Sequence, residues 1–149
     1  AEEHATALGE CAAVAAERCG VEVAVAEEAV ARSFGWGKKS QAFWRKERVD
    51  MPPDVGTVNA AIDFLLDGCG LTEADLPAFV EKFPEVLGCS VDDQLQVAVD
   101  TLAKSYFIPK GKFLVKTLKR KPECLGYNLD CTAIGSGACA GECNRCWVR

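Results

Sequence analysis

The sequence predicts an all-α fold, a short helical-repeat solenoid of about two and a half repeats with an irregular Cys-rich C-terminal tail. The first sign is a duplicated motif, because Phe-Pro-Glu-Val-Leu-Gly at residues 83–88 returns 38 residues later as Lys-Pro-Glu-Cys-Leu-Gly at 121–126. The second is Ala-Ile-Asp at 61–63, which returns 37 residues later as Ala-Val-Asp at 98–100. Self-similarity of this period is typical of stacked helical units, each too small to bury its own apolar face. No run of residues alternates between polar and apolar for long enough to make a sheet.

The composition is that of a globular chain. Its 149 residues are enough for one domain with a substantial core. The charged fraction of 26% and the hydrophobic fraction of 49% exclude a disordered chain. No apolar run reaches the ~20 residues that a membrane span needs. Residue 1 is alanine and no targeting segment is visible, so we expect a mature form after removal of a transit peptide.

Residues 1–57 are predicted to be a divergent N-terminal part of the repeat domain. Apolar residues recur at helical spacing over 5–19, and a glycine follows as a plausible stop. A second helix is expected over 22–33 and a third over 38–48. Met-Pro-Pro-Asp at 51–54 then breaks the helical pattern.

Residues 58–130 are predicted to hold two clear repeats. In the first, Thr57 is placed to cap a helix that runs through Leu66. Thr72 with Asp75 three residues later resembles a capping box, which begins the second helix of the unit.

The second repeat follows the same plan. Ser90 with Asp93 repeats the capping pattern, and Pro109 fits the first turn of the later helix. The apolar residues of that later helix are Phe113, Leu114 and Leu118. Each unit closes on Leu-Gly, where we expect the leucine to pack in the core and the glycine to permit a tight reversal.

These positions carry a family resemblance. In the first copy they are Phe64, Leu65, Gly70, Leu71, Leu76, Phe83, Pro84, Glu85, Leu87 and Gly88. In the second copy they are Leu102, Phe107, Ile108, Phe113, Leu114, Pro122, Glu123, Leu125 and Gly126. A degenerate third copy lies over 25–53, where Gly35-Trp36 aligns with Gly70-Leu71. Over residues 58–130 the chain resembles the mitochondrial transcription termination factor family. The resemblance implies a helical protein of mitochondria or plastids, and many members of that family bind nucleic acid along a basic concave face.

Residues 131–149 form a tail that lies outside the family pattern, after a predicted repeat domain of residues 1–130. Four of the nine cysteines fall in this tail, at Cys131, Cys139, Cys143 and Cys146. We predict that they act as one unit, and three arrangements are open: four ligands of a structural zinc ion, two disulfides, or free thiols or an iron–sulfur cluster. Three further cysteines sit on apolar helix faces and predict buried thiols: Cys11, Cys19 and Cys69.

Charge is distributed unevenly along the chain. Residues 50–103 carry eleven acidic residues and one basic residue, whereas residues 104–121 carry seven basic residues and no acidic one. A smaller basic segment at 37–48 surrounds Phe43-Trp44, where Trp44 is expected to be an exposed aromatic contact. We predict that a partner binds at Phe43, Trp44, Lys110, Lys112, Lys116, Lys119, Arg120 and Lys121.

The predicted function is non-enzymatic, because no nucleophile–base pair can be built around the single histidine, His4. We favour a protein-interaction or accessory subunit of a large organellar assembly, with protein subunits as partners, and a plastid assembly such as a photosystem over a mitochondrial one. The alternative is an organellar RNA- or DNA-binding protein of the transcription termination factor type, which would use the basic helix 109–121. The acidic block beside that helix disfavours nucleic acid, whose affinity comes mainly from phosphate neutralisation.

Overall fold

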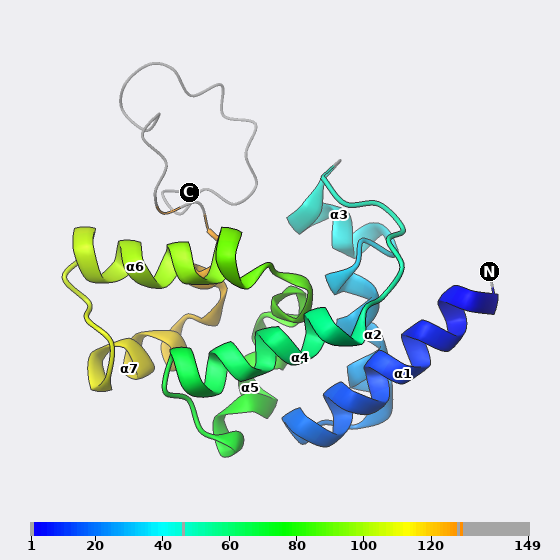
Figure 1. Cartoon of the computed structure of the whole chain (residues 1–149), viewed down its shortest axis with the longest axis horizontal. Coiled ribbons are helices and arrows are strands. Elements are labelled where there is room, and N and C mark those ends of the chain that lie inside the picture. The colour runs from blue at the N-terminus through cyan, green and yellow to red at the C-terminus, as the bar shows by residue number, and fades with distance from the viewer. Residues whose placement is uncertain (1, 46, 128, 130–149) are drawn as a thin grey trace.

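The computed structural model describes residues 2–45, 47–127 and 129. All regular elements in these ranges are helices, and no β-strand occurs among them. Figure 1 shows the helices in a row, from α1 and α2 on one side, through α4 and α5, to α6 and α7 on the other. This arrangement confirms the all-α repeat fold. None of the helices in the described ranges has both the length and the apolar character that a membrane crossing requires.

The N-terminal part consists of α1 (Glu2–Cys19), α2 (Val23–Ser33) and α3 (Lys38–Trp44). Helix α1 packs against α2 and α4. Helix α3 ends earlier than the predicted 48, because Arg45 adopts a φ of 54° and the backbone leaves the helical conformation there.

The first complete unit begins with α4 (Val55–Asp63), which continues as a π-helical turn, η1 (Phe64–Gly68). A short 3₁₀ turn, η2 (Glu73–Asp75), leads into α5 (Leu76–Lys82). The Pro-Glu motif then forms a second 3₁₀ turn, η3 (Pro84–Gly88), so the proline lies at the start of a turn, where its missing N–H is not needed.

The caps of this unit are close to those predicted, with one correction. Thr57 is not the cap of α4, because Asp54 holds that position: its Oδ2 accepts hydrogen bonds from the Thr57 N–H (2.9 Å) and hydroxyl (2.7 Å). The predicted capping box is confirmed, since Asp75 Oδ2 accepts from the Thr72 N–H (2.9 Å) and hydroxyl (3.0 Å). Hydrogen bonds from these threonines lower the pKa of both carboxyl groups.

The second unit repeats the order with η4 (Val91–Leu95), α6 (Gln96–Ser105), α7 (Lys112–Arg120) and η5 (Pro122–Gly126). The Ser90 cap is confirmed, because its hydroxyl oxygen accepts from the Asp93 N–H at 3.2 Å. The placement of Pro109 in the first helical turn is wrong. Gly111 adopts a φ of 110° and starts the helix only at the next residue, which leaves the proline in the α6–α7 connection.

The Leu-Gly endings occupy the core, as predicted for the leucines. Leu87 and Leu125 are both 0% exposed. The reason for the glycines is different from the one expected, because neither adopts a positive φ. A β-carbon on Gly88 would collide with the carbonyl oxygen of Ser33, so this glycine is needed for close packing of η3 against α2.

Gly126 has the same role at a different contact. A β-carbon there would lie 2.6 Å from a ring carbon of Phe43 and 2.7 Å from a ring carbon of Phe83. The two rings are themselves neighbours, with centroids 5.5 Å apart. Residues from the N-terminal part, the first unit and the second unit therefore meet at one point.

Candidate functional site

Helix α7 presents a basic face to solvent. Its buried residues are Leu114 and Leu118, which lie four positions apart and face the core. Lys112, Lys116, Lys119 and Arg120 are exposed on the helix, and Lys110 is exposed in the connection that precedes it. The structure therefore brings together six of the eight predicted partner-binding residues, since Lys121 follows directly at the end of the helix.

Two of these bases already have partners within the chain. Lys119 Nζ lies 3.3 Å from Asp75 Oδ1, and Lys121 Nζ lies 5.2 Å from the centroid of the Tyr127 ring. Within the described ranges, no ion pair involves Lys110, Lys112, Lys116 or Arg120. These four residues make up what we call the basic surface.

The predicted exposed contact at Trp44 is wrong. Trp44 is only 3% exposed, and its Nε1–H donates to the carbonyl oxygen of Arg32 at 2.8 Å. The guanidinium of Arg48 lies 3.9 Å from the centroid of the Trp44 ring and donates to the carbonyl oxygens of Ser33 and Gly88. A planar cation stacks well on an aromatic face, so Arg48, one of the five bases of the predicted basic segment, is half-buried against Trp44.

Phe43 also differs from its predicted role. It is half-buried, and its ring packs against Phe83 and Gly126 instead of projecting into solvent. Of the other bases in the 37–48 segment, Lys39 lies 3.6 Å from Glu28. In the 37–48 segment the aromatic residues and Arg48 pack against the core while Lys38, Lys39 and Arg45 are exposed, and α7 with its preceding connection carries the larger group of exposed bases.

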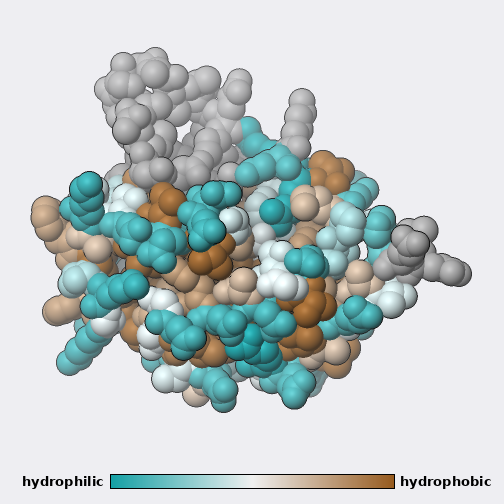
Figure 2. Space-filling model, viewed as in Figure 1, coloured by the Kyte–Doolittle hydropathy of each residue, from teal (hydrophilic) through white to brown (hydrophobic). Residues whose placement is uncertain are grey.

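Two aromatic residues beside the basic surface were not predicted as contacts. Phe107 is 85% exposed and Phe113 is 66% exposed. The sequence analysis grouped Phe113 with Leu114 and Leu118 as the apolar residues of this helix, but only the two leucines are buried. The available signal was that both phenylalanines lie in a segment otherwise rich in lysine. Figure 2 shows that hydrophilic side chains cover much of the visible face, with apolar areas between them.

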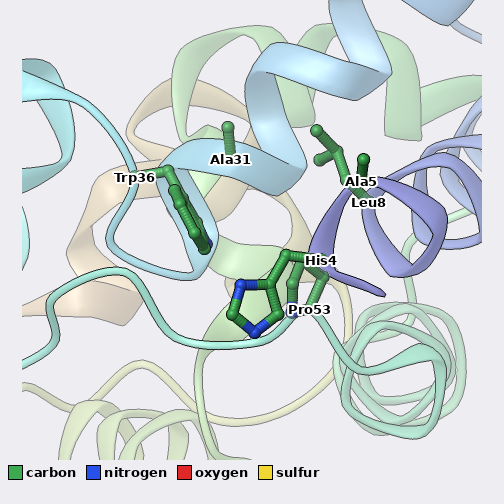
Figure 3. A pocket seen from close by; sticks show the side chains of 6 residues that line it. All are labelled: His4, Ala5, Leu8, Ala31, Trp36 and Pro53. Carbon is green, nitrogen blue, oxygen red and sulfur yellow. The ribbon is translucent and has the colours of Figure 1, made fainter. Parts of the chain in front are cut away.

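A separate apolar pocket of about 250 Å³ lies between α1 and the turn after α2. Figure 3 shows the His4 and Trp36 rings beside each other at the pocket, with their centroids 5.4 Å apart. The other lining residues are Ala5, Leu8, Ala31 and Pro53. Trp36 Nε1 donates to the Met51 carbonyl oxygen at 2.6 Å, and the lining of the pocket is almost entirely apolar.

The predicted tail site, Cys131, Cys139, Cys143 and Cys146, lies outside the described residues. Within the described ranges, no group of three or more His, Cys, Asp or Glu side chains is placed to hold a metal ion. The prediction that Cys11, Cys19 and Cys69 are buried is confirmed. Burial raises the pKa of the first two thiols to about 11 and that of Cys69 to about 12.

A comparison with protein-family models finds a match. The mTERF family model matches residues 53–135, which is more than half of the chain. The matched range contains both complete units and the whole of α7. No match was found among curated proteins or among solved structures.

Proposed function

The chain belongs to the mTERF family, and we propose that it is a non-enzymatic protein-binding subunit of a large organellar assembly that docks through the basic surface. The observation that carries this proposal is the concentration of four exposed bases without an ion pair among the described residues, Lys110, Lys112, Lys116 and Arg120, on one helix and its preceding loop. Proteins of the family are organellar. We favour a plastid assembly, such as a photosystem, over a mitochondrial one, because a small acidic subunit derived from a repeat suits a peripheral position in such a complex.

The surroundings of the basic surface favour a compact partner. The ion pair between Lys119 and Asp75 joins α7 to the acidic first unit. Exposed acids lie further along that unit, at Asp67, Glu73 and Glu81. A nucleic acid strand that left α7 along the row of units would meet these carboxylates and lose affinity at each repelled phosphate. A protein with a local acidic patch needs only the basic surface itself.

The chemistry of the described residues supports a binding role. The single histidine of the chain, His4, lies against Trp36 beside an apolar pocket. Its surroundings offer apolar contact in place of the hydrogen-bonded partner that a general base requires.

The second candidate is an organellar RNA- or DNA-binding protein that uses the same helix. The mTERF match favours it, because nucleic acid binding is the activity associated with the family. Both candidates place the contact on the basic surface, so they differ in the ligand and not in the residues.

The test compares two variants with equal loss of charge. The first replaces Lys110, Lys112, Lys116 and Arg120 by glutamine. The control replaces Lys38, Lys39, Arg45 and Lys82, which are exposed elsewhere on the protein, by glutamine as well. We expect only the first variant to lose co-migration with an organellar assembly on native gels. High salt should abolish the co-migration of the wild type in the same way, because it screens the charge attraction.

The same pair of variants decides between the candidates. Binding to mixed organellar RNA and DNA is measured at ~150 mM salt by a mobility shift. Micromolar or tighter binding that disappears in the first variant and persists in the control establishes the nucleic acid candidate and overturns the protein-binding one.

A further inference from the structure

Phe107 adopts a backbone conformation that glycine adopts elsewhere in the repeat. Its φ is 59°, in the left-handed region, where a side chain of this size is strained. The corresponding positions of the two preceding copies are Gly70, with a φ of 85°, and Gly35, with a φ of 83°. The last unit thus places a phenylalanine where the other copies use the residue that tolerates this conformation.

Hydrogen bonds establish the correspondence between the two complete units. The N–H of Leu71 donates to the Leu65 carbonyl oxygen at 3.1 Å, and the N–H of Ile108 donates to the Leu102 carbonyl oxygen at 2.9 Å. Each bond spans six residues and closes the end of the first helix of its unit. Phe107 lies inside this closed turn, so the surrounding backbone holds it in the strained conformation.

Packing inside the fold does not account for this phenylalanine. Its side chain is 85% exposed, between two half-buried neighbours, Tyr106 and Ile108. Phe113, at the start of α7, is 66% exposed and flanks the same connection. The strain lowers the stability of the isolated protein, and the exposed ring gains no burial that would compensate for it, a combination typical of a residue that serves a contact.

The charge around the two rings defines the partner that they fit. Lys110 lies in the connection between them, and Lys112 and Lys116 are exposed on α7 beside Phe113. Aromatic anchors surrounded by unpaired lysines complement apolar side chains that are flanked by carboxylates.

We infer that Phe107 and Phe113 are the apolar anchors of the basic surface, and that they bind an acidic segment of another protein with apolar side chains between its carboxylates. This inference rests on the proposed function and adds the nature of the partner. The lysines supply charge attraction, and the two rings supply the buried area that selects an amphipathic segment over a merely acidic one.

The test uses variants that separate anchoring from folding. Phe107→Gly removes the ring and relieves the strain, so we expect its melting temperature to rise by about 2–4 °C while its binding weakens. Phe113→Gln removes the second ring but keeps a good helix-forming residue. Val23→Gln is the matched control, because it replaces another exposed apolar helix residue, in the N-terminal part.

The probes are fluorescent synthetic peptides, used in anisotropy titrations with the full chain. One is acidic with interspersed leucine and phenylalanine, and the second has the same charges with serine in the apolar places. We expect the wild type to prefer the first peptide, and Phe107→Gly and Phe113→Gln each to weaken that binding about tenfold without changing the binding of the second. Val23→Gln should bind both peptides as the wild type does.

The outcomes separate this inference from the function on which it rests. If glutamine at the four bases of the basic surface weakens peptide binding but the phenylalanine variants do not, the inference fails and the proposed function stands. If the four-base variant binds both peptides as tightly as the wild type, the proposed function fails as well. Single-stranded RNA that binds more tightly than either peptide and depends on Phe107 would assign the surface to nucleic acid. Concentration-dependent self-association that Phe107→Gly abolishes would assign it to a second copy, and either result overturns the inference.

Discussion

Glu85 in the Pro-Glu turn of the first unit is held by Arg32 of α2: Oε2 lies 2.8 Å from Nη2 and accepts a hydrogen bond from Nε at 3.0 Å. Glu85 is only 4% exposed, so loss of this partner would leave a buried carboxylate without a counter-charge. The ion pair joins the N-terminal part to the first unit. The matching residue of the second unit, Glu123, is half-buried, and no ion pair to it occurs within the described ranges.

This contrast predicts unequal effects of the same substitution. Glu85→Gln should lower the free energy of unfolding by about 1–3 kcal/mol, because it removes a charge-assisted bond and leaves a guanidinium without its counter-charge. Glu123→Gln should change it by less than about 0.5 kcal/mol. Urea unfolding followed by circular dichroism measures both, and equal losses would contradict the assigned role of Arg32.

The two buried leucines should behave alike, since both complete a Leu-Gly ending in the core. Leu87→Ala and Leu125→Ala are each expected to cost about 2–5 kcal/mol, from lost burial and the cavity that remains. Leu66→Ala, at a half-buried position, is the comparison and should cost less. A small effect at Leu125 alone would show that the second unit is not a structural copy of the first.

Substitution of two glycines by alanine should have opposite effects on the free energy of unfolding. A β-carbon on Gly88 would meet the Ser33 carbonyl oxygen and lie 2.9 Å from Arg48 Nη1, so Gly88→Ala should destabilise by about 1–3 kcal/mol. Gly9 lies within α1 with nothing within 4 Å of the added carbon. Gly9→Ala should therefore stabilise by about 0.5–1 kcal/mol. Thermal unfolding of the two variants checks both signs.

The buried thiols predict a loss of stability in alkali. Burial raises the pKa of Cys11, Cys19 and Cys124 from 9.0 to about 11, and that of Cys69 to about 12. Above pH 9 the unfolded chain releases these protons before the folded chain does, so stability is complete below pH 9 and falls as the pH rises towards 11.

The same burial protects these thiols from reagents at neutral pH. Iodoacetamide should leave them unmodified in the native protein and alkylate them after addition of urea, as counted by mass spectrometry. Rapid native modification of Cys69 would contradict the burial described for it. Substitution of Cys69 by serine should remove part of the alkaline sensitivity.

The tail cysteines give a prediction from sequence alone. If Cys131, Cys139, Cys143 and Cys146 act as one unit, native mass spectrometry should show either one zinc ion that a chelator removes or two disulfides that a reductant opens. A mass equal to that of the metal-free, fully reduced chain, unchanged by either treatment, would contradict both arrangements. Cys143→Ser should abolish the zinc or one disulfide.

Local signals predicted the repeats because each has a local cause. The capping pattern at Thr72 and Asp75 and the burial of Leu87 and Leu125 follow from short-range hydrogen bonding and from the apolar period. The error at Thr57 is also local, since an acid three residues earlier competes for the same cap.

The site was harder to predict, because its character depends on contacts distant in sequence. Trp44 among basic residues suggested a surface, yet Arg48 stacks on its ring and donates to Gly88, 40 residues away. Phe113 was grouped with Leu114 and Leu118 as an apolar residue of one helix, yet it lies about 100° around the helix from Leu114 and so faces away from the buried side. The strain at Phe107 becomes visible only when its φ is compared with that of Gly70.

The contact of Gly126 with the Phe43 and Phe83 rings affects how the protein unfolds. In an ideal solenoid each unit touches only its neighbours, so units can unfold from one end. Here the Phe43 ring of the N-terminal part packs against the final Leu-Gly turn. Loss of either end exposes the same aromatic cluster, which ties the units into a single cooperative transition. A fragment cut to the matched range 53–135 would lack Phe43 and Arg32, so the limits of the family match are not the limits of an autonomous folding unit.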